Sequence, residues 1–203
     1  MTNRDDSREA RIRFLRRAMG EADRLSESLE LPREVREIAT ALTRRLRNEK
    51  SLTGRGIEEI VAASIYIGCR MENIPRSPSE IAEVSEYGRK SILRTSKQII
   101  KKLELEIKPS SPIPYIERLA EDLELTGETR SVAVDLAEQT MKKGTHAGKS
   151  PTGLAASAVY AAGRITGEKH TQKELAQMMN VTQLTIRNRH REILDAHPDY
   201  TTS

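Results

Sequence analysis

Residues 54–70 read GRGIEEIVAASIYIGCR, and residues 148–164 read GKSPTGLAASAVYAAGR, a diverged copy of the same stretch. Each run starts at a glycine turn and continues as a segment that is apolar on nearly every side, which is typical of a helix that other helices surround. Alanine, serine and glycine are frequent in both runs, so neighbouring helices can approach closely. These segments predict the centres of two similar all-helical domains.

A second pair of segments repeats at the same distance along the chain. RLSESLELPREVREIATAL begins at Arg24 and RLAEDLELTGETRSVAVDL begins at Arg118, a spacing of 118 − 24 = 94 residues that also separates the two glycine turns. The same offset pairs Ser77 with Thr171, each standing three residues before a glutamate in the pattern of a helix capping box. The chain is therefore predicted to be a tandem duplication of one five-helix unit.

The boundary between the two copies falls in the run KPSSPIP, residues 108–114, because its three prolines cannot continue a helix. We therefore predict a first domain over residues 1–107, a linker over residues 108–114 and a second domain over residues 115–203. The first helix of each copy is predicted over residues 8–29 and 112–123. No segment alternates polar and apolar residues, so no strand is predicted and the fold class is all-α.

Composition narrows the class of protein. Lys and Arg exceed Asp and Glu by four and the isoelectric point is about 9.2, a modest basic excess that permits a nucleic-acid partner. The single cysteine, Cys69, lies in an apolar run, so we expect it to be buried and inert, and the chain cannot build a disulfide framework or a cysteine zinc site. No run approaches the roughly 18 apolar residues of a membrane span, which favours a soluble, intracellular protein.

The most informative stretch for function is TQKELAQMMNVTQLTIRNRHREI, residues 171–193. Leu175 and Met179 give a short first helix an apolar face, Asn180 suits the left-handed conformation of a tight turn, and Thr182 can cap a second helix. This pattern predicts a helix-turn-helix that reads a DNA groove.

The second helix of this motif carries the candidate DNA contacts. The side chains expected to face outward are Gln183, Thr185, Arg187, Asn188, Arg189, His190 and Arg191. The N-terminal residues of such a helix reach base edges and later basic residues meet phosphates. Base contacts are predicted for Gln183, Leu184, Thr185 and Arg187, and phosphate contacts for Lys149, Thr171, Arg189 and Arg191. His190 has no partner at metal-ligand spacing, so no metal or other cofactor is predicted.

The equivalent segment of the first copy, residues 77–102, carries Glu86 to Gly88 at its turn and Arg89, Lys90, Arg94 and Lys97 on its second helix. Its pattern fits a weaker DNA-facing element or a protein-docking one.

The order and content of these motifs resemble the core of archaeal transcription factor B and eukaryotic TFIIB, which are tandems of cyclin-like folds. The resemblance runs from about Ala18 to Ile193 and rests on residues 54–70, 74–85, 148–162 and 171–192. It implies a general transcription initiation factor core that binds the complex of TATA-binding protein with promoter DNA. The helix-turn-helix would read the recognition element upstream of the TATA box, and its base-reading positions fall on Leu184 and Arg187, beside Gln183 and Thr185.

The resemblance also implies partners and a location. These are promoter double-stranded DNA, TATA-binding protein at Arg89, Lys90 and Arg94, RNA polymerase, and a monomer associated with the nucleoid in the cytoplasm of an archaeal cell. Family members carry an N-terminal zinc ribbon, which a single cysteine cannot supply. The sequence therefore fits either a core fragment or a shortened paralogue.

Two other classes of function stand as alternatives. A cyclin-like protein-binding module without DNA binding would treat the basic helix as a solvated surface. An enzyme is disfavoured because the sequence shows no phosphate-binding glycine loop, no metal-ligand cluster and no nucleophile with a base at a recognisable spacing.

Overall fold

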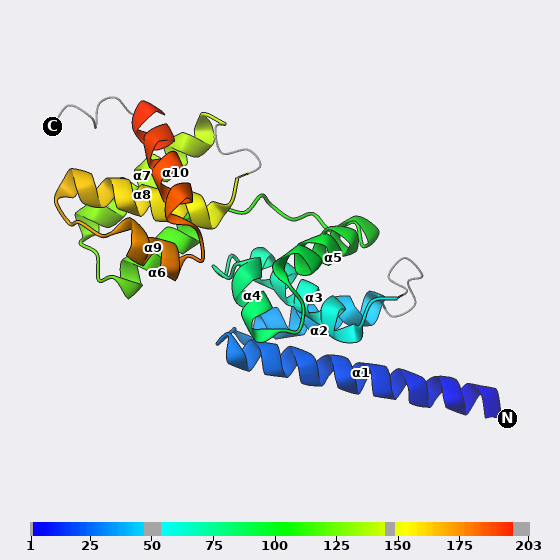
Figure 1. The fold of residues 1–203 in the computed structure, drawn as a ribbon. Coiled ribbons are helices and arrows are strands. Elements are labelled where there is room, and N and C mark those ends of the chain that lie inside the picture. Colours follow the sequence, from blue (N-terminus) through cyan, green and yellow to red (C-terminus); the bar gives the residue numbers. More distant parts are fainter. Residues whose placement is uncertain (1, 47–53, 145–148, 197–203) are drawn as a thin grey trace. The chain divides into compact units, whose positions relative to one another are not determined.

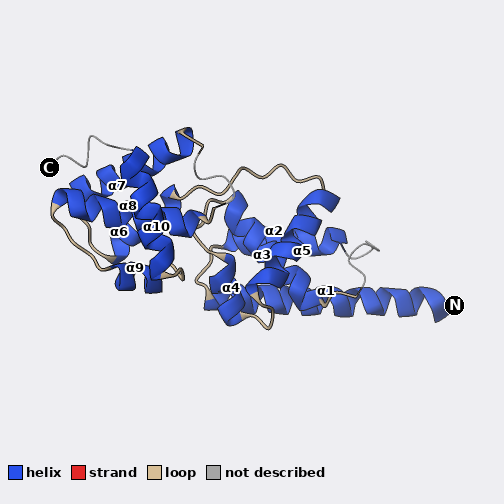
Figure 2. Ribbon diagram, turned by 45° about the horizontal axis from the view of Figure 1, so that its top comes forward, coloured by secondary structure: helices blue, strands red, loops and turns tan. Residues whose placement is uncertain are grey.

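The computed structural model describes residues 2–46, 54–144 and 149–196, and all regular elements among them are α-helices (Figure 2). The prediction of an all-α chain is confirmed for these residues. The chain divides into two compact units, Met1–Lys108 and Pro109–Ser203. Within the described residues, no helix is both long enough and apolar enough to cross a membrane.

The first unit is built around α3. Its helices are α1 (Thr2–Ser28), α2 (Arg33–Leu46), α3 (Ile57–Met71), α4 (Pro78–Val84) and α5 (Arg89–Lys102). Helix α3 packs against each of the other four, and its residues from Glu59 to Cys69 are all buried. The predicted central helix is therefore confirmed. Burial raises the pKa of the Cys69 thiol to about 12, so this cysteine is protonated and unreactive at neutral pH, as expected.

The second unit repeats this arrangement around α8 (Figure 1). Its helices are α6 (Ile113–Asp122), α7 (Gly127–Lys142), α8 (Pro151–Thr166), α9 (Gln172–Met178) and α10 (Gln183–Ala196). Helix α6 begins inside the stretch predicted as a linker, because Pro114 lies in its first turn, where a proline costs no hydrogen bond.

Helix boundaries confirm the duplication. Helices α2 and α7, α3 and α8, α4 and α9, and α5 and α10 each begin 94 residues apart, for example at Ile57 and Pro151 (151 − 57 = 94). The first helices differ, since α1 has 27 residues and α6 has 10. The predicted glycine turn at Gly54 has a φ of 88°, whereas Gly148 lies outside the described residues.

Local capping sets the start of the short fourth helix in both units. The hydroxyl of Ser77 accepts a hydrogen bond from the Glu80 N–H, and the hydroxyl of Thr171 accepts one from the Glu174 N–H. In each case the glutamate side chain bonds back to the N–H of the capping residue. Both predicted capping boxes are therefore confirmed.

Candidate nucleic-acid interface

The turn between α9 and α10 has the geometry of a helix-turn-helix. Asn180 adopts the left-handed conformation with a φ of 49°, as predicted. Its N–H donates to the Gln177 carbonyl (3.3 Å), and the Val181 N–H donates to the Ala176 carbonyl (3.0 Å). These two bonds form the motif that closes a helix through a left-handed residue. These two backbone hydrogen bonds and the left-handed conformation of Asn180 therefore fix the direction in which the chain leaves α9.

Thr182 starts α10, and two isoleucines hold that helix in place. The Thr182 hydroxyl accepts a hydrogen bond from the Thr185 N–H (3.0 Å), which confirms the predicted cap. Ile186 and Ile193 are almost completely buried in the core of this unit. Because they lie on the side of α10 that packs against α8, the opposite side of α10 is left for solvent.

One face of α10 is exposed and combines polar, basic and apolar side chains. Gln183, Leu184, Arg187 and Arg191 are all exposed, and Leu184 keeps 60% of its surface accessible. Arg187 follows Gln183 by four residues and Leu184 by three, and Arg191 follows Arg187 by four, which puts them on the same side of the helix. Among the described residues, neither Arg187 nor Arg191 has an ion-pair partner. The structure therefore brings three of the four predicted base-contact residues together on one face.

Thr185, the fourth predicted base-contact residue, is partly buried beside α8 instead. A Cβ placed on Gly153 would lie 3.0 Å from the Thr185 methyl group, so this close approach depends on the glycine. The Thr185 hydroxyl is 2.9 Å from the Thr182 hydroxyl. The expectation that Thr185 points outward is wrong, because it flanks the side of α10 that packs against α8.

His190 also turns away from the exposed face. Its ring meets the ring of Tyr160 edge-on at a centroid distance of 4.9 Å. Burial lowers the pKa of His190, and the nearby positive charges of Arg164 and Arg191 lower it further, so this histidine is neutral at pH 7. The expectation that His190 points outward is therefore wrong as well. Across the described residues, no group of three His, Cys, Asp or Glu side chains could hold a metal ion.

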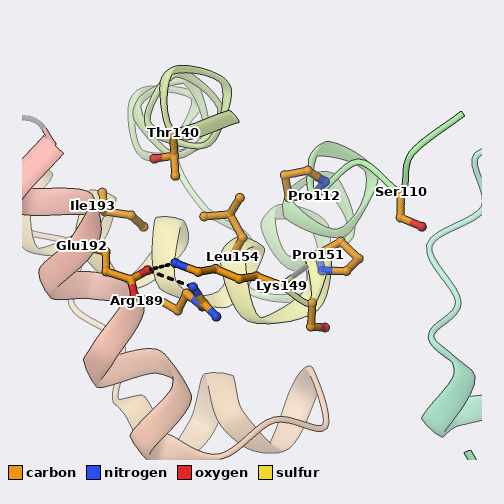
Figure 3. Close-up of a pocket in the computed structure, with 10 residues that line it drawn as sticks. Ser110, Pro112, Thr140, Lys149, Pro151, Leu154, Arg189, Glu192 and Ile193 are labelled. Carbon is orange, nitrogen blue, oxygen red and sulfur yellow. Dashed lines mark hydrogen bonds and ion pairs between the residues drawn. The ribbon is translucent and has the colours of Figure 1, made fainter. Parts of the chain in front are cut away.

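Two predicted phosphate-contact residues meet at one carboxylate. Lys149 Nζ and Arg189 Nη1 each lie 2.8 Å from Glu192 Oε2 (Figure 3). The hydrogen bond from Lys149 lowers the pKa of Glu192, and together with the charge of Arg189 it outweighs burial, which acts to raise this pKa. Arg189 is partly buried rather than outward-facing, with 19% of its side chain exposed. The remaining two candidates, Thr171 and Arg191, are exposed.

The equivalent helix of the first unit, α5, presents a different surface. Arg89, Lys90 and Arg94 are exposed, and the sequence of α5 contains six basic residues and no acidic one. None of these three side chains has an ion-pair partner among the described residues. This strongly basic surface fits the predicted docking role as far as charge is concerned.

The inner side of α5 bonds to a buried carboxylate on α3. Glu59 Oε1 accepts hydrogen bonds from the hydroxyls of Ser91 and Thr95 (both 2.6 Å) and pairs with Arg55. Burial alone would raise the pKa of Glu59, but the two hydroxyls and the Arg55 guanidinium outweigh it and lower the pKa. Glu59 is therefore an ionised anchor between α3 and α5.

Sequence reasoning missed two residues that shape this interface, Glu192 and Gly153. A signal for Glu192 was present, because an acid three residues after Arg189 on a helix is within pairing distance. For Gly153 the signal was the offset of 94, which pairs it with Glu59 of the first copy. Because a glycine in the second copy stands where the first copy has a glutamate, the two copies pack the crossing of these helices differently.

Comparisons with known proteins agree with this architecture. The family described as transcription factor TFIIB repeat matches twice, over residues 14–102 and 105–196. The chain is 45% identical over 190 residues to transcription initiation factor IIB 7 of Halobacterium salinarum, covering 94% of this chain and 59% of that protein. It is 40% identical over 191 residues to transcription initiation factor IIB 2 of Thermococcus kodakarensis, covering 94% and 61%.

A third relative, transcription initiation factor IIB of Methanosarcina mazei, is 42% identical over 178 residues, covering 88% of this chain and 53% of that protein. The chain thus spans between a half and about three fifths of the length of these curated relatives. Among solved structures, a viral cyclin from herpesvirus saimiri aligns with a TM-score of 0.39 and 16% identity over 92% of this chain and 84% of that chain. The two matches of the repeat cover most of the sequence, one in each unit, and the chain therefore belongs to the TFIIB family of transcription factors, which are not enzymes.

Proposed function

We propose that this chain is the core of a transcription initiation factor that binds promoter DNA together with TATA-binding protein, and that α10 reads the DNA upstream of the TATA box. The observation that carries the proposal is the exposed face of α10, where Gln183, Leu184 and Arg187 lie at the N-terminal end of the second helix of a helix-turn-helix. This is the end of the helix that enters a major groove.

The three side chains have complementary chemistry toward base edges. Arg187 can donate two hydrogen bonds to the O6 and N7 atoms of a guanine, and Gln183 can bond an adenine through its N6 and N7 atoms. Leu184 can contact the methyl group of a thymine, which gives its large exposed apolar surface a role.

Phosphate contacts flank this reading face. Arg191 lies on the same face as Arg187, one helical turn further on, and Thr171 begins α9. Lys149 and Arg189 lie together beside the α8–α10 crossing. Basic groups on both sides of a reading helix fix its register on the duplex and make binding dependent on salt.

The first unit is proposed to dock on DNA-bound TATA-binding protein through Arg89, Lys90 and Arg94. The support for this role is that α5 carries six basic residues and no acidic one, which favours a partner surface that is negative, or DNA next to it. RNA polymerase would be a further partner of the assembled complex.

A mobility-shift assay with a TATA-bearing promoter duplex and TATA-binding protein tests the proposal. We expect this chain to add a slower complex that forms less readily as salt rises. Leu184→Asp is a suitable variant, because the side chain is exposed and its loss should not disturb the core. The variant should weaken the added complex. If no slower complex forms with the unaltered chain, the proposal is wrong, and a protein-binding module without DNA binding becomes the better assignment.

A further inference from the structure

We infer that Lys149 and Arg189 form a single binding site for one phosphate of the DNA backbone, and that the Glu192 carboxylate occupies this site in the unbound protein. The inference rests on the proposed function, since it specifies how two of the predicted phosphate contacts work. Glu192 must leave this site before a phosphate of the DNA can enter it.

The geometry is that of an anion site built from two places in the sequence. Lys149 precedes α8, whereas Arg189 belongs to α10, and their nitrogen atoms converge on the same oxygen, Glu192 Oε2, at 2.8 Å each. Figure 3 shows both side chains reaching that carboxylate from different backbone segments. A point held between an ammonium and a guanidinium suits one oxygen of a phosphate as well as one of a carboxylate.

The carboxylate is placed so that it can be exchanged. Glu192 keeps 43% of its side chain exposed, compared with 28% for Lys149 and 19% for Arg189. The acid is therefore the most solvent-accessible of the three side chains. Ion pairs with this much exposure contribute little to stability, so Glu192 can swing outward when a phosphate arrives.

The first unit shows that an uncharged side chain fits the same position. Gln98 is the equivalent of Glu192 and Arg55 is the equivalent of Lys149, and Arg55 Nε donates to Gln98 Oε1 at 3.0 Å. A Glu192→Gln variant would place in the second unit an amide that the first unit already accommodates. The substitution therefore changes the charge of the site without emptying the space.

The carboxylate should weaken binding to every duplex. With Glu192 present, the two cations are partly neutralised before DNA arrives, so fewer counterions are released from the DNA on binding. We expect Glu192→Gln to bind duplex DNA about 3- to 10-fold more tightly at about 0.1 M salt, and to steepen the salt dependence by up to about one charge.

Asp195→Asn is the matched control, because it removes one negative charge from the same helix at an exposed position outside the cluster. We expect it to change affinity by less than about twofold. In the double variant Lys149→Ala with Glu192→Gln, most of the gain should disappear. Affinities come from fluorescence anisotropy of a labelled short duplex at several salt concentrations.

The outcomes separate this inference from the function it builds on. If the unaltered chain binds duplex DNA but Glu192→Gln gains no more than Asp195→Asn, the inference is wrong while the proposed function stands. If neither the unaltered chain nor any variant binds duplex DNA, the inference is wrong, and the proposed function is wrong as well only if the slower complex with TATA-binding protein also fails to form.

Discussion

The α3–α5 crossing of the first unit and the α8–α10 crossing of the second are equivalent in the duplication, yet they place negative charge differently. In the first, the carboxylate of Glu59 is buried between the helices and bonds to two hydroxyls of α5. In the second, Gly153 stands at the equivalent position, and the acid that pairs with the local cations is Glu192 on the surface of α10. The α3–α5 crossing is therefore held by a buried carboxylate and its partners, whereas the α8–α10 crossing is held by close packing of the two helices.

This difference is consistent with the two roles proposed for the helices. A buried ion network ties α5 to its unit, while the outward cations of α5 remain available for a partner. Without a side chain at Gly153, α10 lies close to α8, and the acid of its pairing cluster, Glu192, keeps much of its side chain exposed. A few substitutions at one crossing can therefore adapt the same fold to two different surfaces.

The largest expected effect comes from removing the buried anchor. Glu59→Ala leaves Arg55 without its carboxylate and removes the acceptor of Ser91 and Thr95. We expect a loss of about 3 to 5 kcal/mol in the free energy of unfolding. Denaturant titration gives the size, and hydrogen exchange of α3 and α5 amides shows whether the loss lies in the first unit.

The variant to compare with Glu59→Ala is Glu192→Gln in the second unit. It should lower the free energy of unfolding by less than about 1 kcal/mol, because its ion pair is exposed. Equal losses from the two variants would contradict the contrast between a buried and an exposed carboxylate.

The same comparison predicts a dependence on pH. The pKa of Glu59 is lower in the folded protein than its usual value of 4.5, so its stabilising contribution is complete above that value. The contribution is lost as the pH falls through the lowered pKa of the folded state. The stability difference between the unaltered chain and Glu59→Ala should therefore shrink in acid. Denaturant titrations of both proteins from neutral pH downward measure it, and a constant difference would show that the network does not depend on ionised Glu59.

Substitutions on α10 of the second unit and on α5 of the first unit should change DNA binding in different ways. Arg187→Ala should lower affinity by about 1 to 3 kcal/mol at one upstream base position and relax the preference there. Arg191→Ala should weaken all sequences alike and flatten the salt dependence. Arg94→Ala, on α5, should matter only when TATA-binding protein is present. Binding to a set of single-base promoter variants distinguishes the three, and identical profiles for Arg187→Ala and Arg191→Ala would contradict the assignment of base and phosphate contacts.

A smaller effect is expected at the turns, where the units also differ. Asn180 is left-handed, while its equivalent Glu86 is not among the residues with positive φ. Asn180→Val should therefore cost about 1 to 2 kcal/mol, because a β-branched residue resists that conformation. Glu86→Val lacks this cost and is the control. Thermal unfolding of the two variants compares them directly, and an equal loss at both turns would show that backbone conformation is not the cause.

The parts of this molecule that local interactions control were predictable from the sequence. The capping boxes, the left-handed Asn180 and the threonine cap depend on residues within one turn of each other, and the offset of 94 transferred the capping boxes between copies. The orientation of α10 was harder to predict, because the side chains that flank its two buried isoleucines can point either way. The pairing of Lys149 with Glu192 joins residues 43 apart in the sequence, so it needed the packing of α10 on α8.

The smallest effect on stability is expected for Gly153→Ala, a variant that tests whether Gly153 positions the reading helix α10. Alanine favours a helix over glycine by about 1 kcal/mol. In Gly153→Ala this gain is opposed by the Thr185 methyl group, which would lie 3.0 Å from the new Cβ. Thr185 is held on both sides, since its N–H donates to the Thr182 hydroxyl and its own hydroxyl lies 2.9 Å from that hydroxyl, so relieving the contact should shift the start of α10. We therefore expect a net stability change below about 1 kcal/mol, but weaker DNA binding.

Gly20→Ala in α1 is the control, because nothing lies within 4 Å of its added Cβ, and it should be stabilising with no effect on DNA affinity. A Gly153→Ala variant that behaves in the same way would mean that α10 does not depend on close contact with α8. If Gly153→Ala instead lowers DNA affinity without changing the free energy of unfolding, the glycine is needed to position Gln183, Leu184 and Arg187 and not to stabilise the fold.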